Sequence, residues 1–282
     1  MDIVYPYDLA SFDNPQGFGP ETIEGQIPGS PELPQTPDLR RENPPWTLAD
    51  VARILLVAIV ALVILGAVII PIAARRLGVP PTSAQITENP RVALPVQTAA
   101  YLVVLVFMVA TLRVRQLPFW KSVRWNWPWL RWPAYLLAGV VLGFLIEGAS
   151  AFLPIPKEVP FDKYFTDASG AYLMAVFGIT LAPLMEELFF RGFLYPSLNR
   201  KLGLALSLVI TSLAFAFLHA AQLAHAWAPL FLIFVVGLVL TYTRARTKSV
   251  ASSFLLHAGY NSTLFILMWL ATDHFQHLEK VT

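Results

Sequence analysis

The chain contains apolar runs long enough to cross a lipid bilayer, and this feature leaves few folds open to it. A transmembrane helix needs about 20 consecutive, mainly apolar residues to span the hydrocarbon core. We expect seven spans, at residues 54–74, 94–112, 134–152, 171–195, 204–221, 226–242 and 253–271. The sequence therefore predicts an all-α polytopic membrane protein with about seven transmembrane helices.

The composition agrees with this class and excludes several others. Of the 282 residues, 56% are hydrophobic and 13% are charged, whereas soluble domains carry about 25% charged residues. The net charge is only +2 and the basic residues lie in short loops, so we expect no nucleic-acid partner. Cysteine is absent, which excludes disulfides, thiolate metal ligands and a cysteine nucleophile.

Three regions follow from the distribution of these runs. Residues 1–46 are rich in proline and acidic residues, and we expect a disordered tail there. The tail is no signal peptide, because it has no basic segment followed by an apolar run. Residues 47–170 should form the N-terminal transmembrane helices, and residues 171–272 a second transmembrane group that contains the polar residues of interest.

The basic residues of short loops predict the orientation, since lysine and arginine collect on the cytoplasmic side. They are concentrated at residues 113–131, 200–201 and 244–248. We therefore expect an integral protein of the plasma (inner) membrane, surrounded by membrane lipid, with its N-terminal tail in the cytoplasm. The first loop, with Arg75, Arg76 and Arg91, argues for the opposite orientation.

The fourth run contains three ionisable residues, Glu186, Glu187 and Arg191. A charged side chain at the bilayer centre costs about 2.5–3.5 kcal/mol on insertion scales, so such residues are paired or functional. On a helix Glu187 and Arg191 face one another, whereas Glu186 is rotated by about 100°. This spacing predicts one supporting and one working carboxylate. Pro183 should break the helix just before them.

Two further runs contain polar pairs at helical spacing. Phe215 and His219 lie on one face of the fifth run, and His257 and Asn261 on one face of the seventh. Glu186 and His219 are both about 25 Å of helix from the expected turn at residues 202–203. His257 and Asn261 lie about 16 and 22 Å from the turn near Arg246. These residues are therefore predicted to converge at one depth.

Less specific roles are also open for these side chains. A single transmembrane histidine can serve only as a helix-packing hydrogen bonder, and Glu187 with Arg191 can be only an ion pair. Glu147 lies near the end of the third run and is expected at the interface, although it could line the same cavity. His225, His274 and His277 fall in loop or tail, where we expect no catalytic role.

A carboxylate and two histidines near water support two kinds of chemistry. They can deprotonate water for attack on a carbonyl, with Asn261 and a histidine stabilising the oxyanion. They can also bind a metal ion, through Glu186, His219 and His257, that lowers the pKa of bound water. The sequence leaves both open, although the zinc-protease pattern His-Glu-x-x-His is absent.

The motifs Glu-Glu-x-x-x-Arg, Phe-x-x-x-His and His-x-x-x-Asn occur here in order on three separate runs. Together they resemble the CPBP (CAAX protease and bacteriocin-processing, Abi) family of intramembrane endopeptidases, and are similar to type II CAAX prenyl endopeptidases. The resemblance covers residues 171–271, which it implies are the catalytic core. It implies six site residues: Glu186, Glu187, Arg191, His219, His257 and Asn261.

The resemblance also implies a role for each residue. Glu186 would activate water and His219 would help to hold that water. His257 and Asn261 would stabilise the oxyanion, and Glu187 with Arg191 would position the site. The substrate would be a peptide or protein, prenylated for some members of the family. The resemblance implies either a divalent metal such as zinc or no cofactor.

Two other functions remain open from the sequence. The chain could be a non-catalytic membrane protein of the same fold, such as an immunity or scaffold factor. It could instead be a proton-coupled transporter that uses the carboxylates as a relay, although no inverted hydropathy repeat is evident.

Overall fold

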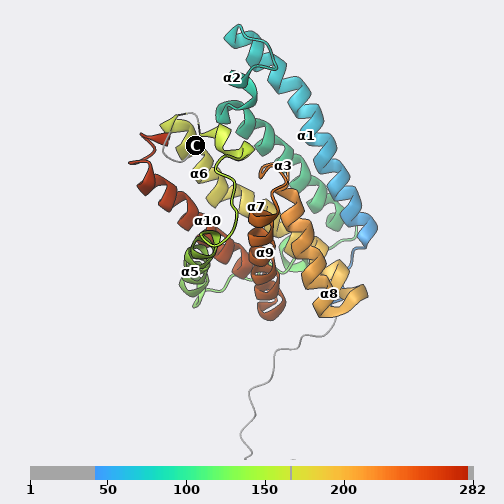
Figure 1. Cartoon of the computed structure of the whole chain (residues 1–282). Helices are drawn as coiled ribbons and strands as arrows, with labels where there is room; N and C mark the ends of the chain where they lie inside the picture. Colours follow the sequence, from blue (N-terminus) through green and yellow to red (C-terminus); the bar gives the residue numbers. More distant parts are fainter. Residues whose placement is uncertain (1–41, 166, 279–282) are drawn as a thin grey trace, which may run out of the picture. The chain divides into compact units, whose positions relative to one another are not determined.

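A computed structural model describes residues 42–165 and 167–278 (Figure 1). Within these residues all regular structure is helical, which confirms the predicted all-α class. Residues 1–41 of the expected tail lie outside the described residues. Six helical stretches of the described chain are long and apolar enough to cross a membrane, and the longest, Ala168–Leu218, contains two of the seven predicted spans.

The helices follow one another with short connections. They are α1 (Leu48–Leu77), α2 (Ala84–Thr87), α3 (Pro90–Arg113), α4 (Phe119–Ser122), α5 (Trp132–Ser150), η1 (Pro160–Tyr164, a 3₁₀-helix), α6 (Ala168–Ile179), α7 (Leu181–Glu187), η2 (Leu188–Leu194, a π-helix), α8 (Tyr195–Leu218), α9 (Trp227–Thr247) and α10 (Val250–Ala271).

Local sequence determines where the helices begin and end. Thr47 and Asp50 form a capping box at the start of α1, and Gly78 ends that helix in a left-handed conformation. Lys248 adopts φ 53° after α9, and the side chain of Ser249 then caps α10. The two helices are therefore joined by only two residues, which fixes α10 beside α9.

The stretch Ala168–Leu218 is interrupted three times. The α-helix breaks at Thr180, between α6 and α7, three residues before Pro183, as the proline predicts. The chain then widens into the π-helical η2, a conformation that the sequence did not predict. Within α8, Gly203 has φ 75° and ψ −176°, a conformation open mainly to glycine. This break lies at the predicted turn and separates the fourth span from the fifth.

The segment formed by α7 and η2 lies between two buried apolar clusters. Leu188 and Phe193 belong to a cluster shared with α1 and α3, two helices that lie side by side (Figure 1). Phe190 belongs to a second cluster, shared with α5, α8, α9 and α10. Consecutive residues of η2 therefore pack on different helices, which holds this segment in the interior.

Helices α5 and α10 approach so closely that their backbones touch. A Cβ atom on Gly259 would lie 2.2 Å from the carbonyl oxygen of Leu136, and one on Gly139 would lie 2.0 Å from that of Leu256. Small residues permit such approach between membrane helices. Gly259 is two positions from both His257 and Asn261, and so lies on the opposite face of α10. Packing on α5 therefore turns the two polar residues toward α6, α7 and η2.

Residues 42–46, which we assigned to the tail, lie against the helices with irregular backbone. Glu42 is 5% exposed and Trp46 is 1% exposed. The indole Nε1 of Trp46 donates a hydrogen bond to the carbonyl oxygen of Phe193 at 3.0 Å. This segment is thus part of the packed structure.

Candidate active site

Glu187 and Arg191 form a fully buried ion pair, the one expected from their spacing. Arg191 Nη1 donates to Glu187 Oε1 at 2.7 Å, and both side chains are 0% exposed. The guanidinium also donates to the carbonyl oxygen of Gly237 at 3.1 Å and to Thr241 Oγ1 at 3.3 Å, both on α9. Its carbon lies 4.5 Å from the ring centroid of Phe215. These hydrogen bonds and the ion pair compensate the guanidinium for the loss of water on burial.

Ser253 on α10 completes the surroundings of Glu187, and the sequence analysis did not identify it. Ser253 Oγ lies 2.5 Å from Glu187 Oε2 and 3.0 Å from the carbonyl oxygen of Leu240. A signal was present, because Ser253, His257 and Asn261 follow one another at intervals of four and share a helix face. Thr241 was also missed, and a threonine in an apolar helix offers no comparable pattern.

His257 lies between the two glutamates. Its Nδ1 is 3.0 Å from Glu187 Oε1, and its Nε2 is 3.8 Å from Glu186 Oε2. Because the same Glu187 oxygen accepts a hydrogen bond from Arg191, Nδ1 is best assigned as the donor to Glu187. That bond fixes the ring orientation and directs Nε2 toward Glu186. The imidazole of His257 thus connects the carboxylate of Glu187 to that of Glu186.

Glu186 approaches His257 as Glu187 does, but it is less buried. Its side chain is 14% exposed, in contrast to the fully buried Glu187. The 3.8 Å between Glu186 and His257 exceeds a direct hydrogen bond, and contacts of this length often involve a water molecule. Glu186 is therefore the carboxylate of the pair that can exchange protons with water.

His219 is joined to this group through Phe215. It caps the end of α8, where its Nδ1 lies 3.0 Å from the carbonyl oxygen of Phe215. The ring centroid of Phe215 is 5.0 Å from that of His219 and 5.6 Å from that of His257. Both imidazoles thus pack on one aromatic ring.

Asn261 is directed to the break between α6 and α7. Its Nδ2 donates to the carbonyl oxygen of Gly178 at 2.6 Å. This carbonyl lies in the last turn of α6, where helix carbonyls lack an intrahelical partner. A second amide hydrogen of Asn261 is available beside this bond. The bond ties α10 to the helix break that precedes Glu186.

The other candidate residues are exposed. Glu147 is exposed on α5, as expected of an interfacial residue. His225 lies in the loop before α9 and His274 packs on Trp269 at 4.1 Å, both exposed. His277 is exposed near the end of the described chain. The structure thus brings together Glu186, Glu187, Arg191 and His257 directly, and His219 through Phe215.

The donor set does not form a metal site in this arrangement. Across residues 42–165 and 167–278, no three histidine, aspartate or glutamate side chains lie close enough together to hold a metal ion. Glu186 and His257 approach one another, and His219 and His257 each contact the Phe215 ring.

Two carboxylates, an imidazole and a guanidinium buried between apolar helices define an integral membrane protein with a polar intramembrane site. Comparison with known families gives the particular assignment. Residues 168–263 match the family model described as Type II CAAX prenyl endopeptidase Rce1-like. The match contains all three motifs and confirms the resemblance that they suggested, so this part of the chain has the fold of a CAAX-type intramembrane protease family.

The chain is also similar to a curated protein. UPF0177 protein YbdI of Lactococcus lactis subsp. lactis (strain IL1403) is 23% identical over 141 residues, which cover 47% of this chain and 74% of the relative. No solved structure matches the chain.

Proposed function

We propose that the protein is an intramembrane endopeptidase that hydrolyses peptide bonds with water activated by Glu186. The observation that carries this proposal is the position of His257, which links buried Glu187 to accessible Glu186 inside the segment that resembles CAAX-type proteases. A carboxylate that can exchange protons with water, beside an oriented imidazole, is suited to general acid–base catalysis.

In the proposed reaction, ionised Glu186 removes a proton from a water molecule while the water oxygen attacks the peptide carbonyl. His219, whose Nδ1 faces the Phe215 carbonyl, accepts a hydrogen bond from this water at Nε2. The carbon–nitrogen bond then breaks, and Glu186 passes its proton to the leaving amine. The water has thus supplied a hydroxyl to one product and a proton to the other.

The oxyanion of the tetrahedral intermediate is stabilised by donors on α10. Asn261 contributes the amide hydrogen that is not used by Gly178. In the protonated state of His257, Nε2–H is a second donor. Because Glu186 has taken the proton of the water at this stage, the charges of Arg191 and His257 then balance those of Glu187 and the oxyanion. Removing one such donor typically slows an enzyme by about 10²–10³-fold. Glu187, Arg191 and Ser253 act as positioning residues.

We propose as substrate a peptide or protein segment that enters the membrane from the cytoplasmic side, the side on which the basic loops lead us to expect the N-terminal segment. The resemblance makes a prenylated segment one form of this substrate, since a prenyl chain would hold the cleavage point at bilayer depth. The membrane proposed is the plasma (inner) membrane.

The proposal is tested with purified full-length protein in lipid vesicles. Turnover of a membrane-anchored peptide is measured for wild type, Glu186→Gln and His219→Ala, each with and without a chelator, on prenylated and unprenylated peptides. We expect wild type to cleave and both variants to lose at least about 100-fold in kcat. Equal cleavage by wild type and Glu186→Gln would show that Glu186 is not the base. Loss of wild-type turnover with chelator would show that a metal takes part.

A further inference from the structure

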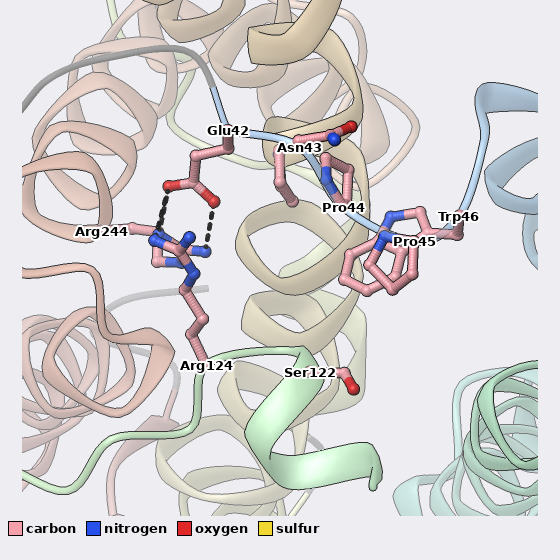
Figure 2. Close-up of a pocket in the computed structure, with 9 residues that line it drawn as sticks. Glu42, Asn43, Pro44, Pro45, Trp46, Ser122, Arg124 and Arg244 are labelled. Atoms are coloured by element: carbon pink, nitrogen blue, oxygen red, sulfur yellow. Dashed lines mark hydrogen bonds and ion pairs between the residues drawn. The ribbon is translucent and has the colours of Figure 1, made fainter. Parts of the chain in front are cut away.

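The N-terminal segment 42–46 is bound at two points to the helices that hold the proposed catalytic group. Figure 2 shows the first point, where the carboxylate of Glu42 faces Arg244 of α9 and Arg124. Arg244 donates Nη1 to Oε1 at 2.9 Å and Nη2 to Oε2 at 3.1 Å, a bidentate pair. Arg124 and Lys248 lie 3.5 and 3.6 Å from the same carboxylate. Three cations thus surround one buried acid.

The second point is Trp46, which binds the π-helical η2. The carbonyl oxygen of Phe193 accepts hydrogen bonds from Trp46 Nε1 at 3.0 Å and from Ser197 Oγ at 2.9 Å. The indole also packs on the Phe193 ring with 4.7 Å between centroids. A π-helix leaves the regular α-helical hydrogen-bond pattern, so partners outside the helix matter more to its geometry. Trp46 is such a partner.

Both points lead to Arg191. It lies within η2, two residues before Phe193, and donates to Gly237 and Thr241 of α9. Arg244 lies on α9 one turn beyond Thr241. The segment 42–46 therefore ties η2, which carries Arg191, to α9, which accepts the hydrogen bonds of Arg191. Two backbone contacts with α8 add to this: Glu42 N donates to Asn199 Oδ1 at 2.6 Å, and Arg200 Nη1 donates to the Pro44 oxygen at 3.1 Å.

The segment is not sealed against the helices. A pocket of about 140 Å³ lies beside it, lined among others by Glu42, Trp46, Ser122, Arg124 and Arg244 (Figure 2). With space on one side, the carboxylate of Glu42 is held by directed polar contacts, whereas Trp46 is held both by its hydrogen bond and by packing in the cluster that contains Phe193. Neutralising Glu42 or removing the indole N–H should therefore be transmitted to η2.

We propose that Glu42 and Trp46 are positioning residues of the peptidase, which fix Arg191, and through it Glu187 and His257, by clamping η2 to α9. This inference rests on the proposed function, because it assigns the segment a role in that reaction. It gives the N-terminal segment a part in turnover although none of its side chains enters the group formed by Glu186, Glu187 and His257.

The test measures kcat and KM of full-length protein in vesicles for two informative variants. Glu42→Gln removes the charge and keeps the shape, and Trp46→Phe removes the N–H and keeps an aromatic ring. Glu88→Gln, in an exposed pair with Lys163, and Trp129→Phe, at a 79% exposed indole, are the matched controls. We expect kcat to fall about tenfold or more for both variants, with KM little changed, since small misplacements cost large factors. Glu42→Gln should also lower the melting temperature, because it leaves buried Arg244 without its counter-ion, so kcat is compared at a temperature at which all variants are folded. Glu42→Asp should recover part of the loss.

A second readout does not depend on activity. Nuclear magnetic resonance of labelled histidine, with His257 assigned by His257→Gln, should show the His257 ring signal shifted in Glu42→Gln and Trp46→Phe but not in the controls. Normal kcat and an unchanged His257 signal in both variants would overturn the positioning role while leaving the proposed function intact. An inactive wild type would instead refute the peptidase, and the His257 signal would still decide whether the segment fixes the site. If Glu42→Gln fails to fold, Trp46→Phe decides by the same two measurements.

Discussion

Oε1 of Glu187 is shared by Arg191 and His257, at 2.7 and 3.0 Å. The sequence predicted a supporting pair, Glu187 and Arg191, and a separate working carboxylate, Glu186. In the structure, the oxygen that binds Arg191 also binds His257, the residue that faces Glu186. Glu187 both neutralises a buried guanidinium and orients the imidazole that faces Glu186. The two adjacent glutamates should therefore respond to the same substitution in different ways.

Glu187→Gln should destabilise the protein, because it leaves Arg191 buried without its counter-ion. Breaking a buried ion pair by removing one partner costs about 3–5 kcal/mol. Glu186→Gln should leave stability nearly unchanged and abolish turnover, because Glu186 is more accessible and has no such partner. The measurement is denaturant unfolding in detergent beside the vesicle assay. Equal destabilisation by both substitutions would contradict the division of roles.

Ser253→Ala should lower kcat without changing KM. It removes the hydroxyl at 2.5 Å from Glu187 and leaves one carboxylate oxygen without this partner. The cost of a lost hydrogen bond to a charged group is about 1.5–3 kcal/mol, shared between stability and turnover. Ser262→Ala is the control, because Ser262 Oγ donates to the carbonyl oxygen of Ala258 within its own helix. A Ser262→Ala effect as large as that of Ser253→Ala would show that the loss is not specific to Glu187.

Gly259→Ala should lower the melting temperature by forcing α5 away from α10. The added methyl group would lie 2.2 Å from the Leu136 oxygen, which the backbone cannot relieve by a change of rotamer. Overpacking of this kind costs about 1–3 kcal/mol. Gly148→Ala on α5 is the matched control, since nothing lies within 4 Å of its added Cβ. If both variants have the melting temperature of wild type, α5 and α10 do not pack as described.

Glu42 should make the stability of the protein fall in acid. Burial raises the pKa of this carboxyl, but Arg244, Arg124 and Lys248 outweigh burial and hold the pKa below its usual value. A group with a lowered folded-state pKa stabilises the fold above its unfolded pKa, about 4.3, and loses this contribution as the pH falls toward the folded-state value. The difference in unfolding free energy between wild type and Glu42→Gln should be constant above about pH 5 and shrink below it. If the difference in unfolding free energy grew as the pH fell, the pKa of Glu42 would be raised in the folded state and not lowered.

The sequence predicted the features that depend on composition and on regular spacing. Long apolar runs defined the membrane helices, and the interval of four joined Glu187 to Arg191. The turn at Gly203 and the break before Pro183 were also predictable, because these residue types restrict or free the backbone in known ways. These features are local, so one chain is enough to infer them.

Other features depend on which helices meet, and one sequence does not specify that. The motif that contains Asn261 does not reveal that its amide also donates to the carbonyl of Gly178 across the interface with α6. Thr241 lies on a helix without any motif and still binds Arg191. Residues 42–46 looked like part of a polar tail because their composition does not reveal that Arg244 and Phe193 provide partners for them.

The π-helical conformation of η2 has a consequence for comparisons with other chains. A π-helix has more residues per turn than an α-helix, so the residues after it point in different directions from those that a continuous α-helix would give. An apolar face of α7 therefore does not continue onto the same face of α8. A helical wheel drawn through the whole stretch would place Glu186 and Tyr195 on wrong relative faces. Removing one residue from η2 would restore α-helical phase, rotate everything beyond it, and separate the guanidinium from α9 although no motif residue had been changed.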